Sequence, residues 1–447
     1  MRKGPGIGRL RIPERLTQRW RARLRAQRRW WREWRRAATA GEVLFPAAGQ
    51  GVVAVQTLTE SGGATGEPRI AILHATAGSG HKRAAQALAA AIGTLAPGAT
   101  VRDVDTLVFA SRLYRGAYAS TYNAMAARAP ALWGVLYHSW ESARLNRSAG
   151  PVRLAMDRLN LRRLGRVVER EAPDAVICTH FLPIEALSIS RGRGRLPVPL
   201  YGVITDFTAH PFWAFPHVDR YFVASDTVAA ELAAHGVSRD RIDVTGIPID
   251  PRFARPIGRE AARERLGLPA SNPVVLVMGG GGGVGPLAEL AQRLAALPQG
   301  PFVVVLCGSN DRMRNRIAAL PAAQAGAVRP LGFSHDVDAL LEACDVVVSK
   351  AGGLTCSEAL VKGAPLVVFR PTPGQEVRNA EYLEAGGAAV HADSVEDVEA
   401  TVARWLADPA ARARVRERAL AMSHPRAAET IARRVLDAMP SRAERTA

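Results

Sequence analysis

The sequence predicts an α/β protein made of two doubly wound halves of similar size. In the first half, short apolar runs such as RIAILHA (69–75) alternate with helical stretches such as KRAAQALAAAIGTL (82–95). The same alternation restarts in the second half at PVVLVM (273–278). Between the halves, residues 251–272 have no long apolar run and are typical of a connection that contains a short helix. Strands that alternate with helices are typical of a parallel sheet with helices on both faces.

Each further strand is predicted from a short apolar or β-branched run that polar or Gly-rich residues bound. Helices are predicted at HDVDALLEAC (335–344) and near 395–421 and 425–438. Two such halves predict two Rossmann-like domains that face a cleft. The further strands are expected at VRDVDTL (101–107), DAVICTH (174–180), PLYGVITD (199–206), RYFVAS (220–225), RIDVTG (241–246), FVVVLCG (302–308), DVVVSK (345–350) and PLVVF (365–369).

Length and composition bound the class of protein. A chain of 447 residues has room for about three domains. A hydrophobic fraction of 48% is enough for large buried cores and excludes a disordered chain. No stretch reaches the roughly 18 apolar residues that a spanning helix needs, and no secretory signal is recognised at the N-terminus. We therefore expect a cytoplasmic protein whose four scattered cysteines are reduced thiols.

The positive charge is concentrated at the N-terminus. Residues 1–36 contain fourteen Lys or Arg and two Glu, so they carry most of the net charge of +18. Trp20, Trp30, Trp31 and Trp34 lie in the same segment, which predicts a basic amphipathic helix with an aromatic stripe. Such a helix suits an anionic membrane surface, a nucleic-acid arm or a solvated basic tail. Only the membrane interpretation agrees with the motifs described below.

The segment 349–379 predicts a site for a nucleotide diphosphate joined to a polyol. Gly352 and Gly353 fall at a strand-to-helix turn, where a phosphate can reach bare backbone amides. Glu358 lies one helical turn further on, within reach of ribose hydroxyls, although Glu is also common on solvated helix faces. We expect Gln375, Glu376 and Asn379 to lie in a loop after PLVVF, where they could hydrogen-bond several hydroxyls; the Pro-Gly turn there makes a purely structural role for Gln375 and Glu376 hard to defend.

Two more Gly-rich loops follow predicted strands. The loop AGSGH (77–81) opens a helix and serves either a ligand or close packing. Its His81 lies at a helix N-terminus, where the macrodipole disfavours the imidazolium, so it could act as a general base or orient a hydroxyl. The five glycines at 279–283 could contact a diphosphate through their amides or form a plain hinge. The Asp-Val-Asp runs at 103–105 and 336–338 are weak metal motifs, and we expect no metal ion.

The segment TDFTAHPFW (205–213) follows another predicted strand. Asp206 falls at the C-terminal edge of that strand, where open α/β sheets place their ligands. It could polarise His81 or be the alternative base, or it could only cap a turn. His210, Phe212 and Trp213 could line the mouth of the site, and a core cluster is an equally good interpretation of the two aromatic residues.

These segments together resemble the processive diacylglycerol glycosyltransferases and monogalactosyldiacylglycerol synthases. Both are relatives of the lipid-linked N-acetylglucosaminyl transferase of peptidoglycan synthesis, in glycosyltransferase family 28. The resemblance covers roughly residues 68–425 and also includes GIPIDPRF (246–253). It implies the GT-B fold, in which the last helix crosses back to the first domain. The expected parts are a membrane-surface helix (1–36), a linker (37–67), an acceptor domain (68–254), a UDP-sugar domain (255–425) and a C-terminal helix and tail (426–447).

The resemblance also implies roles for residues. Phe333 stands where relatives hold the uracil ring, with plain core as the alternative. His74 departs from the small or acidic residue expected there, which leaves the acceptor details open. The implied base is His81 or Asp206, and the implied acceptor residues are Gly78, Gly80, Thr205, His210 and Trp213. The implied nucleotide-sugar residues are Gly280, Gly281, Phe333, Gly352, Gly353, Thr355, Glu358, Gln375, Glu376 and Asn379.

The expected activity is an inverting, metal-independent transfer of a hexose from a UDP-sugar to diacylglycerol, which makes a glycolipid. The expected partners are UDP-glucose or UDP-galactose, diacylglycerol and an anionic membrane surface, with no nucleic acid and no cofactor beyond the co-substrate. The enzyme would then be peripheral, at the cytoplasmic face of the cell membrane. The alternatives are a polyprenyl-linked or other lipid acceptor, a UDP-sugar epimerase, and a nucleic-acid-binding protein.

Overall fold

The computed structural model describes residues 43–47, 50–55, 67–76, 79–111, 114 and 160–439. The chain divides into two compact units, Met1–Thr65 and Gly66–Ala447. In the first unit, β1 (Val43–Ala47) and β2 (Gln50–Val55) form an antiparallel pair inside the segment that we expected to be a linker. The predicted membrane residues Trp20, Trp30, Trp31 and Trp34, and Gly78 of the first Gly-rich loop, lie outside the described residues.

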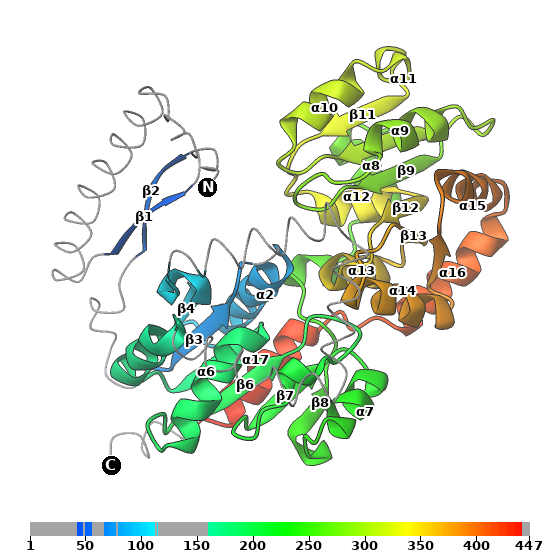
Figure 1. Cartoon of the computed structure of the whole chain (residues 1–447). Helices are drawn as coiled ribbons and strands as arrows, with labels where there is room; N and C mark the ends of the chain where they lie inside the picture. Colours follow the sequence, from blue (N-terminus) through cyan, green and yellow to red (C-terminus); the bar gives the residue numbers. More distant parts are fainter. Residues whose placement is uncertain are drawn as a thin grey trace, which may run out of the picture. The chain divides into compact units, whose positions relative to one another are not determined.

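The second unit contains two parallel six-stranded sheets, which carry what we call the first and the second lobe (Figure 1). The sheet of the first lobe has the order β4-β3-β5-β6-β7-β8. Its strands are β3 (Arg69–His74), β4 (Thr100–Asp105), β5 (Ala175–Cys178), β6 (Leu200–Val203), β7 (Arg220–Val223) and β8 (Ile242–Val244). The sheet of the second lobe has the order β11-β10-β9-β12-β13-β14. Its strands are β9 (Val274–Met278), β10 (Phe302–Leu306), β11 (Val328–Leu331), β12 (Val346–Ser349), β13 (Leu366–Phe369) and β14 (Ala389–Ala392).

The strand orders confirm two doubly wound halves. In the first sheet the chain changes direction between β3 and β5, and in the second sheet between β9 and β12. At such a point the loops after the two central strands diverge, and ligands of open α/β proteins bind there. We therefore expect ligand-binding loops after β3 and β5 in the first lobe, and after β9 and β12 in the second lobe.

The helices agree with most of the sequence pattern. The predicted helix after RIAILHA is α2, and the predicted connection contains η4 and α8. Residues 160–171 are also helical. The remaining bounds are α2 (Ser79–Leu95), η1 (Thr106–Phe109), α6 (Phe181–Gly192), η2 (Pro211–Trp213), α7 (Asp226–Ala234), η3 (Arg239–Arg241), η4 (Pro251–Ala254), α8 (Arg259–Leu266), α9 (Leu287–Ala295), α10 (Asp311–Ala318), α11 (Pro321–Gln324), α12 (Val337–Ala343), α13 (Gly353–Lys362), α14 (Gln375–Ala385), α15 (Val395–Ala407), α16 (Pro409–Ala421) and α17 (Ala427–Asp437).

The last helix returns to the first lobe, as the resemblance implied. Ile431 and Val435 of α17 are buried in one apolar cluster with Ile70 and Ile72 of β3. Figure 1 shows α17, in red, beside α2, although α16 before it belongs to the second lobe. Among the described residues, none of the helices is at once long and apolar enough to span a lipid bilayer.

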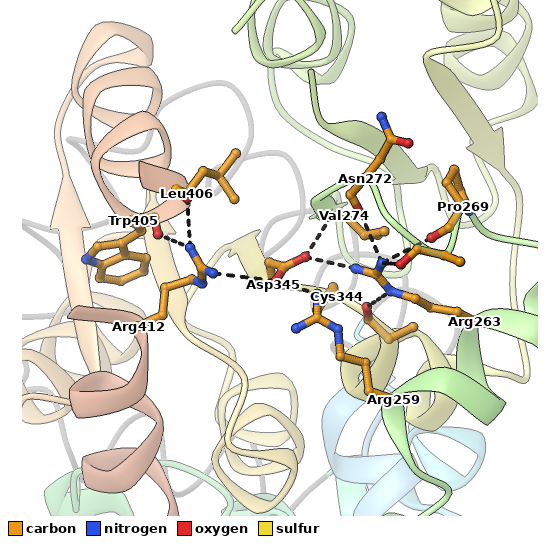
Figure 2. Close-up of polar contacts among 12 residues, drawn as sticks. Arg259, Arg263, Pro269, Asn272, Val274, Cys344, Asp345, Trp405, Leu406 and Arg412 are labelled. Carbon is orange, nitrogen blue, oxygen red and sulfur yellow. Dashed lines mark hydrogen bonds and ion pairs between the residues drawn. The ribbon is translucent and has the colours of Figure 1, made fainter. Parts of the chain in front are cut away.

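A buried ionic cluster lies at the start of the central strands of the second lobe (Figure 2). The Asp345 carboxylate, just before β12, accepts hydrogen bonds from the Arg263 guanidinium at 2.9 Å and from the Val274 backbone N–H at 2.9 Å. Its other oxygen accepts one from Arg259 at 2.6 Å. Arg263 also donates to four backbone carbonyls of the connection and of α12, at Pro269, Ala270, Asn272 and Ala343. The cluster thus fixes the connection onto the sheet.

Candidate active site

His81 lies in the first turn of α2, at the direction change of the first sheet. Its Nδ1 lies 2.8 Å from the carbonyl oxygen of Thr179, which follows β5, and 2.9 Å from the hydroxyl of Thr205. The Thr179 hydroxyl in turn donates to the His81 carbonyl at 2.9 Å. A carbonyl only accepts hydrogen bonds, so Nδ1 carries the proton and Nε2 keeps the lone pair. The ring is therefore held in the tautomer that can accept a proton.

The surroundings keep the His81 ring neutral. Burial lowers the pKa of His81 to about 4, against the hydrogen bond to the Thr179 carbonyl, which raises this pKa. The ring of His180 lies edge-on at 4.6 Å, and burial lowers the pKa of His180 far below its ordinary value. We predicted neutrality from the helix dipole, and burial lowers the pKa of His81 in the same direction.

Asp206 does not polarise His81 in this structure. Among the described residues, the hydrogen bonds of the His81 ring go to Thr179 and Thr205. Asp206 instead accepts a hydrogen bond from Asn379 of the second lobe at 3.0 Å. Burial raises the pKa of Asp206 to about 6, against this hydrogen bond, which lowers it. A carboxyl with that pKa could take up a proton near neutral pH.

Of the other predicted acceptor residues, His210 and Trp213 are buried, whereas Gly80 is not crowded. His210 is buried and caps η2 by accepting a hydrogen bond from the Phe212 N–H at 3.2 Å. Trp213 is 5% exposed and belongs to the main apolar cluster, so the core interpretation is correct for Trp213. Gly80 has open space around its α-carbon at the start of α2.

Gly353 marks a very close approach of the two lobes. A β-carbon on Gly353 would lie 2.0 Å from the carbonyl oxygen of Thr205. Both groups belong to the backbone, so only glycine fits without moving one lobe. Gly352 before it has room, and Thr355 is half-buried in the first turn of α13. The Gly352–Gly353 turn thus lies directly against the residue that contacts His81.

Glu358 is 1% exposed, so the interpretation of a solvated helix face is wrong. One oxygen of its carboxylate is paired with the Arg83 guanidinium of α2. Its other oxygen has no hydrogen-bond partner among the residues that the structure describes. Burial raises the pKa of Glu358 to about 7, against the Arg83 charge, which lowers it. A buried acceptor with a spare oxygen is suited to a ligand hydroxyl.

The five-glycine loop after β9 contains the left-handed residues Gly280 and Gly283, with φ of 67° and 56°. A β-carbon on Gly283 would lie 2.0 Å from the Cys307 carbonyl oxygen, so the loop packs tightly against the end of β10. Gly281 faces the other lobe, because its β-carbon would lie 3.3 Å from the Ser79 hydroxyl. The two predicted Gly-rich loops therefore meet.

The predicted loop after PLVVF is in fact the start of a helix, because Gln375 begins α14 and Asn379 lies within it. The Glu376 carboxylate accepts a hydrogen bond from the Thr372 N–H at 2.6 Å and lies 3.5 Å from the Lys350 ammonium. Asn379 is buried, and its side chain is hydrogen-bonded to protein groups. Its role as a sugar ligand stays a prediction. Gln375 is half-buried in the first turn of α14.

Phe333 is 71% exposed, so the core interpretation of this residue is wrong. Its ring centroid lies 5.0 Å from that of His335. An exposed aromatic ring suits stacking on a base, and that role stays a prediction.

The Asp-Val-Asp runs have protein partners. Asp103 lies 3.1 Å from His74 Nε2, and Asp105 caps η1 through the Leu107 N–H at 3.0 Å. In the second run, Asp336 precedes α12 and is paired with Arg265. His74, which departs from the expected residue type, is thus the partner of Asp103.

Sequence reasoning missed three polar residues of this region. Thr179 and Lys350 each lie at the C-terminal end of a predicted strand, at a direction change of its sheet, so the strand ends were a usable signal. Arg83 carried no comparable signal, because its partner is 275 residues away in the sequence.

Two family models match the chain. A model for monogalactosyldiacylglycerol (MGDG) synthase matches residues 81–249, and one for the glycosyltransferase family 28 C-terminal domain matches residues 274–431. Among solved structures, MurG of Acinetobacter baumannii has a TM-score of 0.52 at 16% identity, over 83% of this chain and 99% of that chain. A putative UDP-N-acetylglucosamine 2-epimerase from Listeria monocytogenes has a TM-score of 0.53 at 15% identity, over 83% and 95%. These likenesses show the fold alone, which is the GT-B fold.

Curated relatives are more similar in sequence. A processive diacylglycerol beta-glucosyltransferase of Bacillus subtilis (strain 168) is 34% identical over 55% of this chain and 64% of that protein. One of Bacillus thuringiensis (strain Al Hakam) is 32% identical over 62% of this chain and 71% of that protein. The match thus spans slightly less than two thirds of the first relative and more than two thirds of the second. The chain belongs to the family of the processive diacylglycerol beta-glucosyltransferases and MGDG synthases, within glycosyltransferase family 28.

Proposed function

We propose that this protein transfers a hexose from a UDP-sugar to the free hydroxyl of diacylglycerol and so makes a glycolipid. Family membership supports this activity, and the names of the relatives favour glucose as the first donor to test. One structural observation carries the proposal. Helix α2 presents His81 to the loops of the first lobe and Arg83, two residues later, to Glu358 of the second lobe. The N-terminal end of α2 thus brings a candidate base, His81, close to a buried carboxylate for the nucleotide, Glu358.

The donor is held by the second lobe. Backbone N–H groups of the Gly352–Gly353 turn and of the Gly280–Gly281 loop bind the diphosphate and stabilise the charge that develops as it leaves. The spare oxygen of Glu358 accepts a hydrogen bond from a ribose hydroxyl. Gln375 and Glu376 lie at the start of α14 and contact the sugar hydroxyls.

The reaction is a single displacement with inversion. The hydroxyl oxygen of diacylglycerol attacks the anomeric carbon, the bond from that carbon to the UDP oxygen breaks, and the hydroxyl proton passes to the base. The base is His81 Nε2 or the Asp206 carboxylate. The two are distinguishable by pH, because the pKa is about 4 for His81 and about 6 for Asp206.

The membrane supplies the acceptor. Diacylglycerol is apolar, so the enzyme must reach it at a bilayer surface. Residues 1–36, with their arginines and with Trp20, Trp30, Trp31 and Trp34, bind that surface at the cytoplasmic face of the cell membrane. Co-sedimentation with anionic vesicles tests this step. Binding should weaken with salt and be absent on RNA, whereas tighter binding to RNA would support the nucleic-acid alternative.

The decisive experiment incubates the protein with diacylglycerol vesicles and separate UDP-sugars, followed by mass analysis of the lipids. A hexosyl-diacylglycerol is the expected product. Conversion of the UDP-sugar without lipid product would instead support an epimerase, and product formed only with a polyprenyl lipid would change the acceptor.

Variants assign the base. His81→Ala or Asp206→Asn should lower kcat by roughly 100-fold or more for whichever residue is the base. His391→Ala, a half-exposed histidine of β14, is the matched control and should stay near wild type. The acidic limb of the wild-type rate should fall near pH 6 for Asp206 and near pH 4 for His81. Near-normal turnover in both variants would show that neither His81 nor Asp206 is the general base.

A further inference from the structure

The side chain of Asn379 makes three hydrogen bonds to protein groups, and it is 0% exposed. Its oxygen accepts from the Phe207 N–H at 2.8 Å. Its amide nitrogen donates to the Asp206 carboxylate at 3.0 Å and to the Ala351 carbonyl at 2.9 Å. An Asn amide has two N–H groups, so no donor remains for a sugar hydroxyl.

The neighbours of Asn379 on α14 hold the same loop of the first lobe. Arg378 is paired with Glu231 of α7 at 2.5 Å, and Glu231 accepts a hydrogen bond from the Ala209 N–H at 2.7 Å. The ring of Tyr382 stacks on that of Phe207 at 5.1 Å. One face of α14 therefore holds residues 206–209 in place, directly or through Glu231. Of these α14 residues, Asn379 is the one that is hydrogen-bonded to Asp206.

The same loop reaches the base region on its other side. Thr205 places its hydroxyl 2.9 Å from His81 Nδ1, and its carbonyl lies against Gly353. The three residues from Thr205 to Phe207 thus contact His81, the Gly352–Gly353 turn and Asn379. A displacement of this segment would move both candidate bases relative to the donor.

We propose that Asn379 is a positioning residue that ties the sugar-binding end of α14 to the loop carrying Thr205 and Asp206, and so sets the base against the donor. This inference rests on the proposed function. It gives Asn379 a different task from the sugar contact expected from the sequence. Gln375 and Glu376, one turn earlier on the same helix, keep that contact.

The link has a titration consequence. The hydrogen bond from Asn379 lowers the pKa of Asp206, against the burial that raises it. Among the described residues, Glu376 on α14 and the Cys356 thiol on α13 interact electrostatically with Asp206. The Glu231–Arg378 pair faces the far end of the loop. Loss of a hydrogen bond to a carboxylate should raise the pKa of Asp206 by about 1–2 units.

The test compares Asn379→Asp with Arg378→Ala, which removes the neighbouring contact between the lobes but leaves Asp206 untouched. We expect Asn379→Asp to lower kcat by about 100-fold with the KM for the UDP-sugar within about threefold, because the reacting groups are misplaced rather than the donor lost. If Asp206 is the base, the acidic limb of kcat against pH should also move up by about 1–2 units; if His81 is the base, kcat falls without this shift. Arg378→Ala leaves the three hydrogen bonds of Asn379 in place, so it should lower kcat by clearly less than Asn379→Asp and should leave the pH profile unmoved.

Four results would overturn the inference. A raised donor KM or a changed sugar preference with an unmoved pH profile would make Asn379 a sugar ligand. An equal loss in Arg378→Ala with the same pH profile would make the whole contact a general brace between the lobes. If Asn379→Asp had the kinetics of active wild-type protein, the positioning role of Asn379 would be rejected and the proposed function would stand. Wild-type protein without transferase activity would overturn the proposed function as well.

A second variant covers misfolding. If thermal unfolding shows that Asn379→Asp is not folded, Asn379→Ser gives the same two measurements without a second carboxylate. Its short hydroxyl side chain does not reach Asp206, so the same loss of kcat and the same shift in pH are expected.

Discussion

Replacing Asp345 by Asn should destabilise the second lobe more than any exposed charge change. The substitution keeps the size of the side chain but removes the negative charge. Arg263, which is 4% exposed, would then keep a buried positive charge without its counter-ion. Breaking a buried ion pair from one side costs about 3–5 kcal/mol of unfolding free energy. For a lobe of this size, that lowers the unfolding midpoint by about 6–20 °C.

The control for this prediction is Arg259→Ala. Arg259 also pairs with Asp345 at 2.6 Å, but its side chain is half-exposed. Exposed pairs contribute about 0–1 kcal/mol, so the midpoint should fall by less than about 4 °C. Differential scanning calorimetry measures both variants beside the wild type. Equal shifts for the two variants, or a shift below about 4 °C for Asp345→Asn, would refute the reasoning that burial of the counter-ion decides the cost.

Three further outcomes are expected. Gly353→Ala should lower the transfer rate by about 100-fold, because its β-carbon would lie 2.0 Å from the Thr205 carbonyl oxygen. The control Gly93→Ala has open space in α2 and should raise the unfolding free energy by about 0.5–1 kcal/mol. Similar transfer rates in the two variants would contradict this prediction. Burial raises the pKa of Glu358 from its ordinary 4.5 to about 7, so its contribution to stability is present below about pH 4.5 and is lost as the pH rises through about 7. Thermal unfolding from about pH 5 to pH 8 should show less pH dependence in Glu358→Gln, and an unchanged slope would reject the assignment. Ile431→Ala should lower the unfolding free energy by about 2–5 kcal/mol in a denaturant titration, because this side chain of α17 is fully buried, and a loss below about 1 kcal/mol would show that α17 is not needed to cover the first sheet.

The central strands of both sheets could be predicted from sequence, because they are buried on both faces and therefore consist of continuous apolar runs. The two edge strands of the second sheet, β11 and β14, were not predicted. Edge strands need less apolar surface, and β11 contains Arg329 and Pro330 while β14 contains His391. The helix that begins at Gln375 was not predicted, because the Pro-Gly pair before it is typical of a turn or loop.

The site could be predicted only as separate pieces. His81, Asp206, Gly353 and Glu358 were each recognisable from their place after a strand or in a helix. Their contacts were not recognisable, because Asn379 meets Asp206 across 173 residues of sequence. A local pattern carries no information about which loop of one sheet lies against which loop of another.

The return of α17 to the first sheet means that the two lobes are not consecutive pieces of the gene. A first lobe expressed without residues 427–437 would leave an apolar face of its sheet open to solvent. A chimera that exchanges the second lobe between relatives should therefore have two junctions, one between β8 and β9 and one between α16 and α17. A single-junction exchange would also replace a piece of the first lobe's core.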